Sequence, residues 1–553
     1  MQISPWHERC SAPRRMHTRA PAEGLAGLRE TWRADVVSGF LVFLIALPLC
    51  LGISMASGFP PVAGILTAIV GGVVATFFGS APLTIKGPAA GLIVIALGAV
   101  QDLGGGDPIL GYRRALATIV IAGVIQVVFS LVRAGALGDL FPSSVVHGML
   151  AAIGVIIIAK QVHVMLGVPG VSGEPLELLA RIPASIASMN PEIVVIGTLS
   201  LIVLFGMPML PWSWTKKIPP PLVVVVLAMS LASYFDLGHE HHYHVASHDY
   251  VVGPSFLVRL PGSLLSAITL PDFSSAFDAT SIRYVVMFAL VGSIESLLSA
   301  KAVDSLDPLK RRSDLDRDLL ATGIGNVIAG MIGGLPMISE IVRSSANVNN
   351  GARTRLANFS HGVFLLLFVS VAPWLLQRIP LAALAAMLVY TGLRLASPQE
   401  LARTWRIGRE QMVIFGATLL VTLATDLLVG VLAGILVKTA LHWRNGMPLR
   451  NVLRPHVEVI EDGEVTTLRI AQAAVFSNFL TIKRHLAQVP AQRSVVIDLS
   501  GTHIVDHTVM ERLHELMDEW NLVGRQLEVI GLDAHRGLSE HPLAARKKAL
   551  EVA

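Results

Sequence analysis

The sequence predicts an α-helical polytopic membrane protein, with fourteen segments arranged as two inverted halves of seven, followed by a cytoplasmic α/β domain. Three observations lead to this fold class: a low charge content over most of the chain, a series of apolar runs, and two short interrupted runs at matching places. Of the 553 residues, 53% are hydrophobic and 15% are charged, whereas a soluble protein averages about 25% charged residues. The mean hydropathy is +0.63.

The distribution of charge divides the chain into three parts. Residues 1–34 are polar and basic, residues 35–443 contain the apolar runs, and residues 444–553 have the charge density of a soluble domain. We therefore expect a cytoplasmic N-terminal segment, a transmembrane domain and a soluble C-terminal domain. A secretory signal peptide is not expected, because the first apolar run begins only at Val36 and has no clear cleavage site.

The apolar runs supply the membrane-spanning segments, each of which needs about 20 apolar residues, or fewer in a half-helix. They lie at residues 36–55, 61–79, 88–101, 114–133, 144–166, 191–210, 219–235, 284–302, 317–334, 337–348, 357–377, 380–396, 411–426 and 427–443. Basic residues gather after the even-numbered segments, which the positive-inside rule places in the cytoplasm. Examples are Lys216, Lys217, Lys310, Arg311 and Arg312. We expect a multi-pass protein of the cell (inner) membrane with both termini in the cytoplasm.

The third and tenth segments are short, and each follows a Gly/Pro break, "TIKGPAAG" and "GGLPMISE". Interrupted helices at matching places of an inverted repeat are typical of a transporter's binding site. Two half-helices whose N-termini face each other offer free N–H groups and partial positive charge to an anion. Small residues let the backbone approach the ligand, and Pro88 fits the first turn of a helix. The residues of this stretch are Gly87, Pro88, Ala89, Ala90 and Gly91.

Four charged residues lie inside the apolar segments or at their edges, where ionisable groups are costly and usually functional. Glu295 can hold a cation or a proton, or can be a hydrogen-bonded packing residue. Arg343 can attract an anion, or can be a structural cation paired with Glu340 or Glu295. Glu340 and Lys86 can form an ion pair across the site, Glu340 can carry a proton with the anion, or either side chain can be solvated in an aqueous cavity.

Several motifs together resemble the sulfate permease (SulP) family of anion transporters. They are "GFPPVAGILTAIVGG", "GPAAG", "GIGNVIAGMIGGLP" and "VRSSANVNNGARTRLANFSHG". The later stretch "SVVIDLSGTHIVDHTVMERLHELMDEW" looks like a STAS domain, the usual cytoplasmic appendage of this family. The resemblance implies a core domain and a gate domain that move as an elevator, usually in a homodimer, with a cytoplasmic regulator acting at the STAS domain.

The resemblance also implies roles for individual residues. Substrate would lie between the third and tenth helices, beside residues 87–91 and beside Ser339, Glu340, Ile341 and Arg343. Glu295 matches an acidic position on the eighth helix that binds sodium in one member of the family, and Ser299 matches a hydroxyl one turn later that would be a sodium ligand there. The chain departs from the family at Glu340 and Ile341, where a small residue and a hydroxyl are common, and at Lys86, where Ser or Thr is common. The missing hydroxyl at Ile341 weakens the case for sodium.

Two features outside the membrane segments carry further alternatives. Thr508 matches a phosphorylated position of related bacterial regulators and also suits a helix N-cap; we favour the cap. The histidine-rich stretch at 239–248 is consistent with zinc binding or with a pH-responsive loop. Its histidines have no ordered spacing, so no metal site is predicted.

The expected function is secondary active transport of a small inorganic oxyanion, bicarbonate or sulfate, by symport with H⁺ or Na⁺. With Glu340 in the site, a monovalent anion, or one entering with a proton, is easier to accept on charge. Alternatives are an anion channel or exchanger, a C4-dicarboxylate transporter of the same family, and a nucleobase carrier. No P-loop is present, and neither enzymatic activity, a cofactor beyond the coupling ion, nor nucleic-acid binding is expected. The expected partners are the anion, the lipid bilayer and a second copy.

Overall fold

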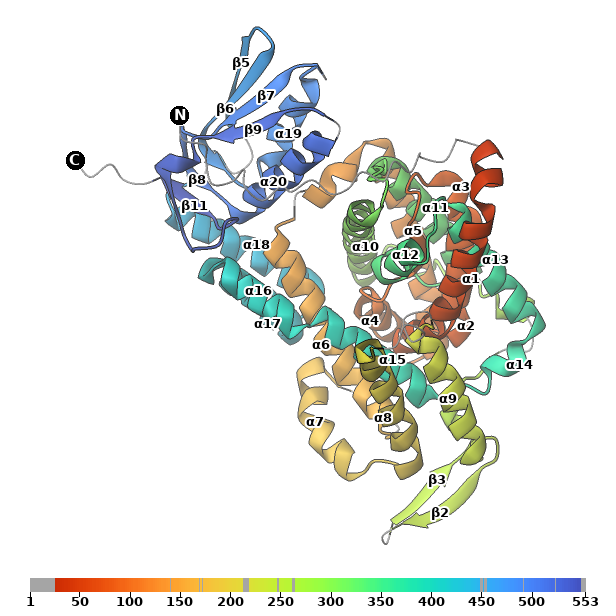
Figure 1. Cartoon of the computed structure of the whole chain (residues 1–553). Helices are drawn as coiled ribbons and strands as arrows, with labels where there is room; N and C mark the ends of the chain where they lie inside the picture. The colour runs from red at the N-terminus through yellow and green to blue at the C-terminus, as the bar shows by residue number, and fades with distance from the viewer. Residues whose placement is uncertain are drawn as a thin grey trace.

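The computed structural model describes residues 25–548, except for 140, 169, 172, 212–217, 246–247, 261–263, 448–450, 452–454, 491 and 523. A large helical part is followed by a smaller α/β domain at the C-terminal end (Figure 1). The predicted fold class is thereby confirmed. Residues 1–24 of the predicted N-terminal segment, and the predicted cytoplasmic residues Lys216 and Lys217, lie outside the described residues.

Every predicted apolar segment coincides with a helix, a run of helices, or a short strand that leads into a helix. In the described part of the chain, eight helical spans are long and apolar enough to cross a membrane, and three shorter apolar helices accompany them. The helices in chain order are α1 (Leu25–Ala56), α2 (Pro61–Ile69), η1 (Val70–Val74), α3 (Ala75–Phe78), α4 (Ile93–Gly104), α5 (Pro108–Leu131), η2 (Ala134–Asp139), α6 (Ser143–Met165), α7 (Pro175–Ala187), α8 (Pro191–Gly206), η3 (Met207–Met209), α9 (Pro220–Tyr234), η4 (Pro254–Phe256), η5 (Leu265–Ala267), α10 (Ala279–Leu306), α11 (Leu315–Ile332), α12 (Ile341–Asn349), α13 (Leu356–Val371), α14 (Pro373–Leu376), α15 (Leu381–Leu395), α16 (Pro398–Ile407), α17 (Arg409–Ala424) and α18 (Leu427–Arg444).

The membrane helices form two packed groups. The core group comprises α1 to α5 and α10 to α13, in which α5 packs along α11, α4 and α10, and α1 packs along α13 and α2. The gate group comprises α6, α8, α9, α15, α17 and α18, in which α6 packs along α15 and α17. The groups lie beside each other in Figure 1, with the core group to the right. Helices that are adjacent in space are therefore often distant in sequence.

The two interrupted segments meet inside the core group. Residues before α4 form strand β1 (Ile85–Pro88), and residues before α12 form strand β4 (Met337–Glu340). The strands are antiparallel, with Ile85 opposite Glu340 and Pro88 opposite Met337. All eight residues are buried. The prediction that Pro88 begins a helix is wrong: Pro88 ends β1, and α4 begins only at Ile93.

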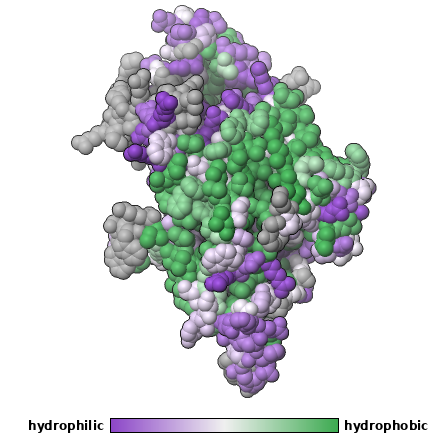
Figure 2. Space-filling view, turned by 90° about the vertical axis from the view of Figure 1, so that its right-hand side faces the viewer, coloured by the Kyte–Doolittle hydropathy of each residue, from purple (hydrophilic) through white to green (hydrophobic). Residues whose placement is uncertain are grey.

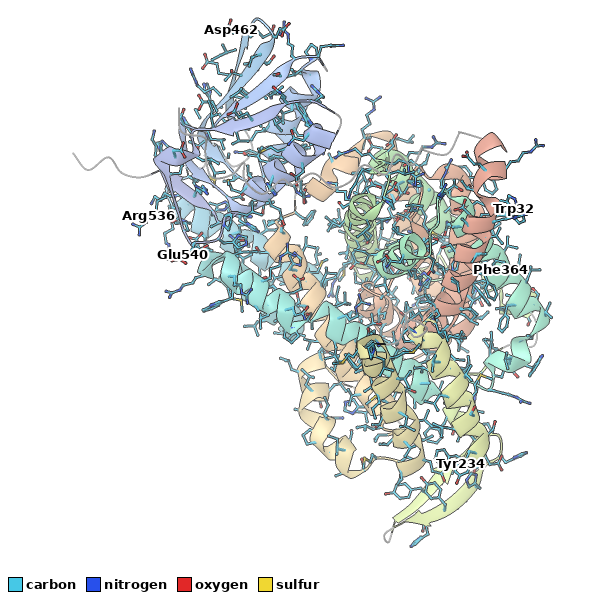
Figure 3. The ribbon with its side chains drawn as sticks, viewed as in Figure 1. Trp32, Tyr234, Phe364, Asp462, Arg536 and Glu540 are labelled. Carbon is cyan, nitrogen blue, oxygen red and sulfur yellow. The ribbon has the colours of Figure 1, made fainter. Side chains whose placement is uncertain are left out.

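A broad hydrophobic band covers the face shown in Figure 2, between hydrophilic regions at the two ends of the molecule. Trp32, in the first part of α1, and Tyr234, the last residue of α9, are exposed and lie far apart on the helical part (Figure 3). Aromatic side chains with a polar tip favour the two membrane interfaces. By contrast, the residues labelled on the α/β domain in Figure 3 are charged: Asp462, Arg536 and Glu540.

The histidine-rich stretch forms an exposed hairpin at the end of the molecule opposite the α/β domain (Figure 1). Its strands are β2 (His241–Val245) and β3 (His248–Val252), paired in antiparallel register. His244 pairs with Asp249, and His239 pairs with Asp236 at 2.9 Å. Within the described residues, no group of three or more His, Cys, Asp or Glu side chains could hold a metal ion.

The C-terminal domain is a mixed sheet with two flanking helices, α19 (Phe479–Gln488) and α20 (His507–Leu522). The sheet order is β10-β11-β8-β6-β7-β9, with β5 on β6. Strand β7 lies between β6 and β9 and is parallel to both. Apolar side chains of the sheet and both helices share one core. The strands are β5 (His456–Asp462), β6 (Val465–Ala474), β7 (Ser494–Asp498), β8 (Thr502–Val505), β9 (Leu527–Ile530), β10 (His535–Gly537) and β11 (Arg546–Lys548).

A buried ion pair attaches this domain to the gate group. Lys438 of α18 lies 3.0 Å from Asp506, and both side chains are fully buried. The Lys438 ammonium also donates to the Thr508 hydroxyl at 2.7 Å. The prediction that Thr508 caps the helix is wrong, because Asp506 accepts from the backbone N–H of Val509 at 2.7 Å and is itself the cap of α20. Thr508 instead packs against a membrane helix.

Removing the cation of this pair should weaken the contact between the two parts. In Lys438→Met, Asp506 stays buried without its counter-cation, which costs about 3–5 kcal/mol. We expect a lower unfolding midpoint and faster proteolysis of the α/β domain in the purified protein. The double variant Lys438→Met/Asp506→Asn should recover much of the loss. Arg403→Met, which removes an exposed ion pair of α16, should change little; an equal effect of both single variants would contradict the assignment.

The pH range over which this contact is stable depends on the ionisation of Asp506. Burial alone would raise its pKa, but Lys438 and the backbone donors Val509 and Phe476 lower the pKa below its ordinary value. A lowered folded-state pKa contributes stability above the unfolded value of about 3.9 and loses it as the pH falls through the folded value. Hydrogen exchange at the amides of Phe476 and Val509 should therefore stay protected from pH 8 to pH 5. Loss of protection near pH 6 would mean that an ionisable group other than Asp506 controls the pH dependence of the contact.

Candidate functional site

The candidate site lies where β1 leads into α4 and β4 leads into α12. Glu340 ends β4 and directly precedes α12. Its Oε1 accepts a hydrogen bond of 3.3 Å from the backbone N–H of Ala90, just before α4. The two half-helix starts are therefore in contact, as the interrupted segments predicted. Free N–H groups at such starts, together with the helix dipole, favour an anion.

Arg343 is the cation of this site. It lies in the first turn of α12, is only 1% exposed, and none of its three guanidinium nitrogens has a hydrogen-bond partner among the described residues. A Cβ on Gly87 would overlap its Nη1, so the β1 backbone lies directly against the guanidinium. A buried arginine without a partner is costly. An oxyanion can supply both the missing charge and the missing acceptors.

Glu295 of α10 lies against the backbone just before α4, beside Gly91. Its carboxylate is buried, and neither oxygen has a hydrogen-bond partner among the described residues. A Cβ on Gly91 would overlap this carboxylate, which therefore lies directly against the backbone leading into α4. Glu295 and Glu340 are close enough for mutual electrostatic repulsion. Two carboxylates thus share a buried site with one arginine.

Lys86 does not pair with Glu340, so the predicted ion pair across the site is wrong. Its ammonium is bonded to Asp318 of α11 at 2.9 Å. It also donates to Ser339 at 2.9 Å and to Thr322 at 3.2 Å. Asp318 compensates the positive charge, and α11 presents both Asp318 and Thr322 because they are one turn apart. Lys86 is therefore a structural cation that ties both strands to α11.

The remaining predicted residues are divided between the site and its surroundings. Ala89 is buried, and its N–H donates to the carbonyl of Pro336 at 3.2 Å. Ser339 belongs to the Lys86 network, because its hydroxyl donates to Asp318 at 3.0 Å. Ile341 is 43% exposed, and Ser299 is half-buried. The Ser339 hydroxyl is therefore engaged with Lys86 and Asp318, and the binding roles predicted for Ser299 and Ile341 stay predictions.

The structure adds polar residues that the sequence reasoning missed. Asn326 of α11 both donates to and accepts from the backbone of Met337, at 3.2 and 2.6 Å. Asn358 accepts from Lys86 N–H at 3.2 Å, and Ser344 accepts from Ile85 N–H at 2.8 Å. The sequence contains a signal for these residues, because each is a polar residue within or beside an apolar segment. Such residues are expected to satisfy the hydrogen bonds of non-helical backbone in a membrane.

Two further buried residues surround Arg343. His361 of α13 has no hydrogen-bond partner on either ring nitrogen among the described residues. Cys50 of α1 is a buried free thiol. Both lie within electrostatic reach of Arg343. The wall of the site is thus built from α1, α10, α12 and α13 of the core group.

A family model supports the interpretation of this geometry. The model described as the sulfate permease family matches residues 32–418. The chain belongs to this family. The match includes β1, β4 and all the core helices, so the strand pair and its charged surroundings lie within the family's transport domain. The predicted resemblance is confirmed.

Individual relatives agree along nearly the whole chain. A putative sulfate transporter of Bacillus subtilis, YvdB, is 24% identical over 518 residues, covering 91% of this chain and 92% of its own. The bicarbonate transporter BicA of Synechocystis is 24% identical over 520 residues, covering 90% and 88%.

Solved structures show the same fold. The transmembrane domain of a cyanobacterial BicA aligns with a TM-score of 0.62 at 25% identity, covering 73% of this chain and 97% of that domain. SLC26A9 aligns with a TM-score of 0.66 at 14% identity, covering 91% of this chain and 85% of its own, and therefore supports the fold alone. The second alignment extends beyond the membrane domain, in agreement with a STAS-like C-terminal sheet.

The structural role of Lys86 can be tested with a double-mutant cycle. Lys86→Met leaves Asp318 buried and unpaired, and we expect a loss of stability of about 3–5 kcal/mol. Lys86→Met/Asp318→Asn should be less destabilised than the sum of the two single variants, since the lone charge is gone. The measurement is the thermal unfolding midpoint of the purified protein. Additive effects would show that the two side chains do not form the central pair.

Proposed function

We propose that the protein is a secondary active transporter of a small inorganic oxyanion, with bicarbonate or sulfate as the substrate. The observation that carries this proposal is the buried guanidinium of Arg343 beside the start of α4, which has no hydrogen-bond partner in the described part of the chain. The printed names of the relatives, which include sulfate and bicarbonate transporters, agree with an oxyanion. The anion would bind Arg343 through two oxygens and accept from the backbone N–H groups near Ala90.

Charge balance favours a coupled cation. Arg343 carries one positive charge, while Glu295 and Glu340 can carry two negative charges, and Lys86 is already balanced by Asp318. An anion entering this site would add further negative charge. A proton or a sodium ion bound with the anion restores the balance. We favour the proton, because Ile341 has no oxygen where the family commonly has a hydroxyl.

An elevator movement of the core group against the gate group would alternate access to the site. One described ion pair crosses between the groups: Arg283 of α10 lies 2.8 Å from Asp426, the cap of α18. Both side chains are partly exposed, and such pairs contribute about 0–1 kcal/mol. The pair can therefore break during transport at little cost.

The proposal also covers the location of the protein, its assembly and its domain organisation. We propose a cell-membrane protein with both termini in the cytoplasm, acting as a homodimer, with residues 35–443 as the transport domain and residues 444–553 as the STAS domain. The buried contact between Lys438 and Asp506 would let a cytoplasmic regulator at the STAS domain act on the gate group.

Transport into proteoliposomes tests this function. Labelled bicarbonate and sulfate are offered under imposed proton or sodium gradients, and we expect saturable uptake of one of them driven by acid outside. Arg343→Gln should reduce uptake at least ~100-fold, since it removes the charge and the planar fork. Arg343→Lys should retain partial activity. Arg181→Gln, on the exposed surface of α7, is the control.

The outcomes separate the competing functions. Full activity of Arg343→Gln, or no movement of either anion by the wild type, would refute the proposal. Flux that follows the membrane potential without saturation would favour a channel. Uptake that requires a counter-anion inside, and no cation gradient, would favour an exchanger. Dependence on sodium alone would replace the proton as coupling ion.

A further inference from the structure

Glu340 occupies an unusual place for a carboxylate in an anion site. The residue ends β4, opposite Ile85, and its backbone directly precedes α12. Its side chain does not cap its own helix; it reaches across to the start of α4 and accepts from Ala90 N–H at 3.3 Å. The positive end of α4 is thus in contact with a negative group supplied by the protein itself. That position is the one proposed above for the transported anion.

The contact that holds Glu340 is weak. Its hydrogen bond to Ala90 is long, and it is the hydrogen bond that the described residues offer to this carboxylate. Arg343 attracts Glu340 electrostatically but makes no hydrogen bond to it within the described structure. A free oxyanion with several acceptor oxygens can satisfy the same groups better. Glu340 is therefore a ligand that substrate can replace.

Charged and titratable groups surround Glu340 on each of the elements that pack around it. Arg343 lies on α12, Glu295 on α10 and Cys50 on α1, and all three interact with one another or with Glu340 electrostatically. His361 of α13 faces Arg343. On β1, Lys86 is engaged by Asp318 of α11. Among these described residues, the cation available to both Glu340 and an incoming anion is thus the guanidinium of Arg343.

We infer that Glu340 is an intramolecular competitor of the transported anion, whose carboxylate occupies the start of α4 until substrate displaces it. The inference rests on the proposed function and assigns the coupling proton to a residue. Displaced Glu340 lies in a buried site with the bound anion and Glu295, where like charges repel strongly. Its carboxylate therefore takes one proton from the aqueous phase. The acid returns this proton to water on the other side, when the anion leaves and the carboxylate rebinds Ala90 N–H.

This arrangement has two consequences for transport. Without substrate, Glu340 occupies the start of α4 and attracts Arg343 electrostatically, but it makes no hydrogen bond to the guanidinium within the described structure. With substrate, one proton travels with each anion. A monovalent anion then crosses without net charge, which links the choice of substrate to the presence of Glu340.

The test compares Glu340→Gln with Glu295→Gln in purified protein, using bicarbonate and sulfate as probes. An amide cannot compete as an anion, so Glu340→Gln should bind the transported probe at least tenfold more tightly than the wild type near neutral pH. Infrared difference spectra should show a carboxylic acid C=O band when the anion binds to the wild type. This band should persist in Glu295→Gln and disappear in Glu340→Gln. Glu177→Gln, on the exposed surface of α7, controls for removal of a carboxylate elsewhere.

Glu340→Asp provides a second variant that keeps the charge. Its shorter side chain loses reach toward Ala90, so anion affinity should rise while the infrared band remains. Unchanged affinity in both Glu340 variants, or a band that disappears in Glu295→Gln instead, would overturn the inference and leave anion transport intact. If the wild type neither binds nor moves bicarbonate or sulfate, the proposed function fails, and this inference fails with it.

Discussion

The antiparallel pairing of β1 with β4 is the constraint on which the rest of the membrane domain depends. Non-helical backbone inside a membrane must find every hydrogen-bond partner within the protein. The two strands supply part of this for each other, and side chains complete it: Asn326 for Met337, Ser344 for Ile85 and Asn358 for Lys86. The buried pair of Lys86 with Asp318 then ties the strands to α11. Each of these polar residues is needed because two helices are interrupted.

The same pairing produces the functional site. It brings the starts of α4 and α12 together, so that the N–H of Ala90 and the guanidinium of Arg343 lie on one buried surface. Glycines at 87 and 91 let the backbone approach Arg343 and Glu295, respectively. The site therefore combines a helix start, one cation and two carboxylates in a buried region of the core group. On the proposed function, this excess of carboxylates is the reason to expect that a proton or another cation moves with the anion.

The sequence predicted the membrane segments well because spans are encoded locally, as runs of apolar residues between breaks. The two interrupted segments and the family resemblance also predicted that Ala90, Glu340 and Arg343 lie at one site. Glu295 was predicted to be functional, since a charged residue within an apolar segment is costly and usually serves the function of the protein. The sequence could not predict the ion-pair partner of each charged side chain. Lys86 is near both Glu340 and Asp318, and the choice depends on the direction in which β1 presents its side chain. The prediction of the cap of α20 failed for a different reason: Asp506 and Thr508 both suit a cap by type, and only the residue at which the helix begins, His507, distinguishes them.

The most direct test of this account is an electron cryo-microscopy map of the protein in lipid nanodiscs, with and without a saturating concentration of the transported oxyanion. The account predicts anion density between the backbone of Ala90 and the guanidinium of Arg343, with the Glu340 side chain turned away from Ala90. Without the anion, Glu340 should occupy that place. Anion density elsewhere, or Glu340 on Ala90 in both maps, would contradict the account.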